Sequence, residues 1–172
     1  MALVALGFAG TVLWRTSVGV HMAVVGKPGA DWWKLITAPF TYNNTGYAFA
    51  VLVAIALYGW LLERRHGPLV VLVVFAVGGI GGTAAAAAAS DFPIVLGANG
   101  AALAMVIAWA IPDLMSMRAG EDHEGDLLGT AAIAAVVALM PLVVKESSWI
   151  ADGVGVLAGL VIGLPLARTL RR

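Results

Sequence analysis

The sequence predicts an all-α integral membrane protein with six membrane-spanning helices. Of its 172 residues, 61% are hydrophobic and only 12% are charged, and the mean hydropathy is +0.95. A soluble domain averages about 45–50% apolar and about 25% charged residues, so this chain has too little polar surface to cover a water-facing globule. Hydrocarbon is therefore the expected solvent around most of it, and helices satisfy their own backbone hydrogen bonds there.

Hydrophobic stretches of about 20 residues, the length that crosses a bilayer, locate the six spans. They are predicted at residues 2–24, 46–63, 68–89, 94–112, 127–145 and 149–168. The breaks between them carry proline, glycine or charge, as turns do. The acidic break at 121–126 is expected to be a solvated linker, and Arg15 falls near the middle of the first span. We see no internal repeat and expect residues 1–172 to form a single membrane domain.

Lysine and arginine positions orient these spans. With six spans both termini share one side, and that side holds Arg64, Arg65, Arg118, Arg168, Arg171 and Arg172. The opposite side holds Lys27, Lys34 and Lys145. Because cytoplasmic loops carry the excess of positive charge, both termini are expected in the cytoplasm. The expected location is the cell membrane of a prokaryote.

Composition excludes several kinds of site. The chain contains no cysteine, which rules out disulfides and thiolate chemistry. Its net charge is zero, so nothing favours nucleic acid as a partner. Histidines and carboxylates show no metal-ligand spacing. We therefore expect no metal and no cofactor, and membrane lipids are the partner that the composition implies.

Small residues in the later spans predict close helix packing. Gly155, Gly159 and Gly163 repeat every four residues and so share one helix face. Small residues at this spacing let membrane helices approach closely. Internal packing is the expected role of this face, and homodimerisation through it is the alternative.

Two polar residues stand near the start of the fourth and sixth spans. Asn99 and Asp152 lie at a similar depth, since both spans begin on the same side. A polar side chain at membrane depth is unfavourable unless it has a partner. The sequence therefore predicts a hydrogen bond from the Asn99 amide to Asp152.

Four separated motifs stand out along the chain: WWKLITAPFTY (32–42), GWLLERRHG (59–67), LGANGAALAM (96–105) and WIADGVGVLAGLVIGL (149–164). Together they resemble the rhomboid family of intramembrane serine proteases. The first, with Trp33 and Lys34, resembles the family's Trp-Arg loop segment. GWLLERRHG (59–67) resembles its G-x-x-x-E-x-x-x-G signature, which Gly59, Glu63 and Gly67 supply.

The other two motifs open the fourth and sixth spans. LGANGAALAM (96–105) resembles the G-x-S-G motif of the nucleophile, and WIADGVGVLAGLVIGL (149–164) resembles the A-H-x-x-G-x-x-x-G segment of the general base. The resemblance covers nearly the whole chain. It implies a six-helix rhomboid-like bundle with a client-accessible groove between spans two and five.

The chain differs from the family pattern at the positions of the catalytic residues. Asn99 stands at the place of the serine, two residues after Gly97, and Asp152 at the place of the histidine. Tyr47 and Val51 stand where the family has the second-span H-x-x-x-N pair that helps to hold the oxyanion. Covalent acyl transfer needs a hydroxyl or thiol activated by a base, and losing an oxyanion donor costs about 10²–10³ in rate.

These residues predict a catalytically degenerate, rhomboid-like pseudoprotease, and we expect no catalytic residues in it. It would bind transmembrane clients or regulate membrane proteins. Two alternatives stay open. One is an active rhomboid-type endopeptidase with an unrecognised nucleophile, such as Ser147 or Ser148 with His21. The other is a structural subunit of a membrane assembly. The oligomeric state is left open.

Overall fold

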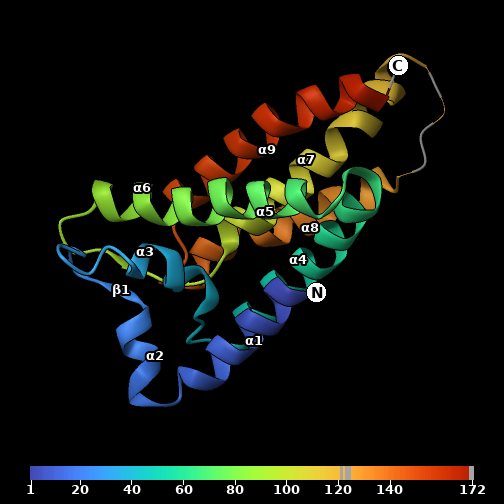
Figure 1. The fold of residues 1–172 in the computed structure, drawn as a ribbon. Coiled ribbons are helices and arrows are strands. Elements are labelled where there is room, and N and C mark those ends of the chain that lie inside the picture. The colour runs from blue at the N-terminus through green and yellow to red at the C-terminus, as the bar shows by residue number, and fades with distance from the viewer. Residues whose placement is uncertain (121, 123–124, 171–172) are drawn as a thin grey trace.

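Long helices make up most of the protein, and the computed structural model describes residues 1–120, 122 and 125–170. Arg171, Arg172 and half of the acidic break, residues 121, 123 and 124, lie outside the described residues. Within the described part, four helices are long and apolar enough to cross a membrane. They are α4 (Thr45–His66), the segment Pro68–Ala89, α7 (Asn99–Arg118) and α9 (Trp149–Leu170), seen together in Figure 1. The chain is therefore a mainly helical integral membrane protein.

The segment Pro68–Ala89 is one continuous helical segment with three parts. α5 (Pro68–Phe75) passes into a π-helical turn (Ala76–Ile80) and then into α6 (Gly81–Ala89). The turn contains Gly78, where an added Cβ would collide with the Gly100 carbonyl oxygen and the Ala104 side chain of α7. Glycine therefore lets the widened turn rest directly on α7.

Helix α7 is the centre of the bundle. Thirteen of its side chains are buried, and α4, α5, α8 and α9 all pack against it. The seam with α9 is close: added Cβ atoms at Gly155 and Gly159 would collide with α7, and one at Gly163 would make tight contacts with Ala108 and Ile111. This confirms internal packing as the role of that glycine face. The homodimer alternative is wrong for this face, because α7 already covers it.

Shorter elements complete the fold. They are α1 (Ala2–Leu13), α2 (Ser17–Met22), α3 (Lys34–Thr37), a 3₁₀ turn (Ala38–Phe40), α8 (Leu127–Ala138) and a second 3₁₀ turn (Met140–Leu142). Strands β1 (Val24–Val25) and β2 (Ile94–Val95) pair antiparallel, with Val24 opposite Val95. In Figure 1, α2, α3 and β1 gather at one end of the bundle. The pairing of β1 with β2 fixes the loop before α7 to the loop that follows α2.

Three of the six predicted spans differ from the structure. The stretch 2–24 is not one helix, because α1 ends at Leu13 and an extended residue, Thr16, precedes α2. Arg15 therefore lies in a turn after α1 and not within a span. The stretch 127–145 ends its α-helix at Ala138, before Pro141. Both helical pieces are shorter than a full span.

The fourth span begins and ends later than predicted. Helix α7 starts at Asn99, because residues 94–95 pair with β1, and it continues through Pro112 to Arg118. A proline interrupts one helical hydrogen bond without always ending a helix. Asp113, which follows it, is therefore a helical residue and not part of a loop.

Candidate functional site

Asn99 and Asp152 form a buried pair at the junction of α7 and α9. Asn99 is the first residue of α7, and Asp152 lies in the first turn of α9. The Asn99 Nδ2 donates to Asp152 Oδ1 at 2.5 Å and to the Val137 carbonyl oxygen of α8 at 3.0 Å. The predicted hydrogen bond is therefore confirmed. Both side chains are at most 5% exposed, so the pair is closed off from solvent.

Two tyrosines cover the turn that leads into α7. The Tyr47 hydroxyl donates to the Leu96 carbonyl oxygen at 3.3 Å, and the Tyr42 hydroxyl accepts from the Ala98 N–H at 3.3 Å. Their rings meet edge to face with centroids 5.5 Å apart. Burial raises the pKa of the Tyr42 hydroxyl, so that group stays neutral.

Gly97 is the residue on which Tyr47 rests. Its φ is +81°, and a Cβ there would collide with the Tyr47 ring. The Gly97 N–H donates to the Ala38 carbonyl oxygen at 3.0 Å. Val51, one turn further along α4 from Tyr47, is fully buried. The backbone N–H groups of Gly97 and Ala98 are therefore engaged, and aromatic carbon fills the space above them.

The site holds unused polar atoms as well as satisfied ones. Among the described residues, Asn99 Oδ1, Asp152 Oδ2 and Ser147 Oγ are buried without a hydrogen-bond partner. Ser147 lies beside the Tyr47 hydroxyl. Ser148 Oγ accepts the Ile150 N–H at 3.3 Å, which is the behaviour of a helix cap. His21 lies within electrostatic range of Asp31.

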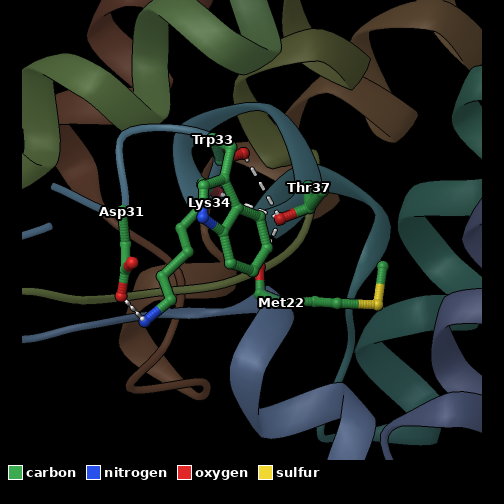
Figure 2. Close-up of polar contacts among 5 residues, drawn as sticks. All are labelled: Met22, Asp31, Trp33, Lys34 and Thr37. Carbon is green, nitrogen blue, oxygen red and sulfur yellow. Dashed lines mark hydrogen bonds and ion pairs between the residues drawn. The ribbon is translucent and has the colours of Figure 1, made fainter.

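The loop with Trp33 and Lys34 is held by local contacts, shown in Figure 2. Lys34 Nζ forms an ion pair with Asp31 at 2.7 Å. The Thr37 hydroxyl donates to the Met22 carbonyl oxygen at 2.7 Å. The hydrogen bond and charge of Lys34 lower the pKa of the Asp31 carboxyl. These residues shape the loop and do not reach the Asn99–Asp152 pair through any contact that the structure shows.

Gly59, Glu63 and Gly67, the residues of the second-span signature, lie in the C-terminal part of α4 and at its end. Gly67 ends the helix with φ +88°, and its N–H donates to the Glu63 carbonyl oxygen at 2.8 Å. The Glu63 side chain is exposed. At Gly59 an added Cβ would make only ordinary contacts with Met105 and Val71. Of the three, Gly67 has the clearest structural requirement, because its positive φ favours glycine.

A buried ion pair near that end was missed from the sequence. Arg65 of α4 lies 3.4 Å from the Asp113 carboxylate of α7, and its guanidinium stacks over Trp109 at 5.5 Å. Asp113 is 5% exposed. Its proximity to Pro112 had placed it in a loop. The signal was a carboxylate four residues after an apolar tryptophan, where a continuing helix would bring the two together.

This arrangement links α7 to α8 and α9 through the hydrogen bonds of the Asn99 amide. An amide nitrogen is a very weak nucleophile because its lone pair is delocalised, and neither member of the pair carries a hydroxyl or thiol. Among the described residues, those with hydroxyls nearby include Tyr42, Tyr47 and Ser147. Tyr47 already donates its proton to a backbone carbonyl. No group of three or more histidine, cysteine or acidic side chains with metal-binding geometry occurs in the described part of the chain.

Comparison with known proteins places this fold. No curated protein matches the chain. A sequence model of the rhomboid domain matches residues 29–169, which is most of the chain and includes the Trp33 loop, α4, α7 and α9. The helix that carries Asn99 and the helix that carries Asp152 thus both lie within the matched region, and the chain belongs to the rhomboid family.

Proposed function

We propose that this protein is a rhomboid-like pseudoprotease, which binds transmembrane clients or regulates membrane proteins without cutting them. The observation that carries the proposal is the buried Asn99–Asp152 hydrogen bond, at 2.5 Å, at the position where the family has its serine and histidine. Tyr47 supports it, because its ring fills the space beside Gly97, two residues before Asn99. The helices of the family are retained, whereas asparagine and aspartate replace the serine and histidine of its dyad.

A cleft between α4 and α8 supports client binding. It has a volume of about 320 Å³, and Leu57, Leu61, Trp109 and Ile133 are among the residues that line it. One hydrogen bond bridges its two helices, from the Tyr58 hydroxyl to Thr130 Oγ1 at 3.1 Å. Helix α8 buries only two residues, Thr130 and Val137, whereas α4 buries eight and α7 thirteen. Side chains of a client helix that lies against this cleft would meet mostly apolar residues.

We further propose that α1 and the α8 segment complete a six-helix bundle whose termini both face the cytoplasm of a prokaryotic cell. Arg64, Arg65, Arg118 and Arg168 lie at the ends of α4, α7 and α9. The positive-inside rule places those ends in the cytoplasm. The chain has no cysteine, so single cysteines at Asp91 and Gly120 can be tested with a membrane-impermeant maleimide. Labelling of Asp91→Cys in intact cells, without labelling of Gly120→Cys, is expected; the reverse pattern would overturn the orientation.

Photo-crosslinking tests the client cleft. A benzophenone amino acid at Ile133, which lines the cleft, is expected to crosslink membrane proteins in cells. The same residue at Leu69, which is 72% exposed on α5, is the matched control and is expected to crosslink lipid. If both positions give the same products, the cleft is not a client site and a structural role in a membrane assembly becomes the better explanation.

A fluorophosphonate probe tests the absence of catalysis. Purified wild type in lipid nanodiscs is expected to remain unlabelled. A variant carrying Asn99→Ser, Asp152→His, Tyr47→His and Val51→Asn is expected to label, because it restores the dyad and clears the aromatic ring. Labelling of wild type that Ser147→Ala or Ser148→Ala abolishes would establish an active endopeptidase and refute the pseudoprotease.

A further inference from the structure

The outer surface of α1 and α4 holds an apolar groove that the proposed function does not use. Its volume is about 540 Å³, and its walls run from Met1 to Thr11 on α1 and from Thr45 to Ala56 on α4. The lining side chains follow helical stripes on both helices, with Val4, Ala5 and Phe8 facing Ala48 and Leu52. Figure 1 shows the two helices side by side.

The groove exists because α1 touches the bundle along a different face. Gly7 and Gly10 are the only buried residues of α1. Added Cβ atoms there would collide with Leu52 and with the Phe40 carbonyl oxygen. The neighbouring face of α1 therefore stands away from α4, and small side chains such as Ala5 and Ala48 leave the gap open.

The length of the groove matches a single hydrocarbon chain. Residues 1–11 rise about 15 Å along the helix axis, which is about half of the 30 Å hydrocarbon core and therefore the depth of one leaflet. An acyl chain of one leaflet would thus run along the groove from end to end. Water is excluded as the occupant because the walls are apolar.

A cation stands beyond the Thr11 and Thr45 end of the groove. Arg15 is the second residue after the end of α1 and lies four residues after Thr11, and its side chain is exposed. It has no ion pair among the described residues. The Trp14 indole N–H donates to Asn43 Oδ1 at 2.7 Å, which fixes this end of α1 against the residue before α4. The only nearby carboxylate in these contacts, Glu146, accepts a hydrogen bond from Asn43 at 2.9 Å.

We propose that this groove binds one anionic phospholipid of the leaflet at the Asn99–Asp152 end of the bundle. One acyl chain lies along the groove towards the bilayer centre, and the phosphate group meets Arg15 at the interface. Arginine and tryptophan commonly occupy this depth of a membrane. The lipid would fill the gap between α1 and the bundle, so that α1 packs as firmly as the longer helices.

Native mass spectrometry of the delipidated full chain tests the proposal. The probes are phosphatidylglycerol and phosphatidylcholine with identical acyl chains. Wild type is expected to bind one phosphatidylglycerol about fivefold more tightly than phosphatidylcholine, since one basic residue at the surface contributes about 1 kcal/mol. Arg15→Gln is expected to abolish this preference, whereas Arg168→Gln, which lies near the far end of α9, is expected to keep it. A preference that survives Arg15→Gln would overturn the headgroup assignment.

A second pair of variants tests the acyl site. Ala5→Phe fills the groove from an exposed position and is expected to weaken both lipids at least tenfold. Ala9→Phe makes the same change on the same helix outside the groove lining and is expected to bind as wild type. Wild-type lipid binding by Ala5→Phe, or an adduct of peptide mass in place of lipid, would overturn the proposal.

Discussion

The hydrogen bond between Asn99 and Asp152 should stabilise the fold by an amount that a double-mutant cycle can measure. Asn99→Ala removes the donor that serves both Asp152 Oδ1 and the Val137 carbonyl oxygen. Asp152→Ala removes the acceptor and leaves the Asn99 amide with one partner. A buried group left without its partner costs about 1–3 kcal/mol, so each single variant is expected to lower the free energy of unfolding by that amount.

The coupling between the two changes is the informative quantity. Hydrogen bonds between membrane helices average about 0.6 kcal/mol in such cycles and reach about 1.7 kcal/mol. Both members of the pair are nearly fully buried, so water competes little for this hydrogen bond. We therefore expect a coupling energy in the upper half of that range, about 1–1.7 kcal/mol. The double variant should be more stable than the sum of the single effects predicts.

Reversible unfolding in mixed lipid–detergent micelles would measure all four proteins. The matched control is the cycle of Tyr58→Phe and Thr130→Val, which removes another buried interhelical hydrogen bond, 3.1 Å long. That cycle is expected to give about 0.6 kcal/mol. A coupling at Asn99 and Asp152 below about 0.3 kcal/mol would be indistinguishable from additivity. It would refute the view that these two residues stabilise one another.

Three further measurements follow from the same structure. Gly155→Ala places a methyl group against the backbone of Gly100 and is expected to destabilise the protein by about 1–3 kcal/mol. Gly153→Ala, with open space around it, should stabilise the protein by up to about 1 kcal/mol. Equal melting temperatures of the two variants would contradict the close seam. Tyr47→Phe is expected to cost about 1 kcal/mol for its hydrogen bond, but Tyr47→Ala about 3–5 kcal/mol for the cavity, as chemical denaturation would show. Lys34 lowers the pKa of the Asp31 carboxyl, so this carboxyl should stabilise the folded loop at pH values above its unfolded pKa and lose that effect as the pH falls through its folded pKa. Carboxyl NMR should show that the Asp31 pKa rises in Lys34→Gln. An unchanged titration would exclude the ion pair.

Much of the fold was predictable because the hydrocarbon core of a membrane requires long apolar helices that satisfy their own backbone hydrogen bonds. The second, third and sixth spans were recognised within a few residues of α4, of the segment 68–89 and of α9, since each is a long apolar run with a charged or glycine-containing end. The Asn99–Asp152 hydrogen bond was predicted from depth alone. Two polar groups on neighbouring helices at one level of a bilayer have few other partners.

The remaining differences come from interactions that no local pattern encodes. Residues 94–95 are as apolar as a span, yet they pair with β1, which lies about seventy residues earlier in the chain. Apolar periodicity also continued past Leu13, although the chain turns there before α2. At the site, the sequence indicated that Tyr47 replaces a polar residue, but only the structure shows its ring resting on Gly97. Packing of this kind depends on where distant segments meet.

The seam between α7 and α9 has a consequence for how such a protein can change over evolutionary time. The spacing of the two helices is set by backbone contact at glycines such as Gly155, not by the side chains at positions 99 and 152. Those two positions can therefore vary without moving the helices that carry them. The fold in this sense separates its helix geometry from the identity of the residues at those two positions.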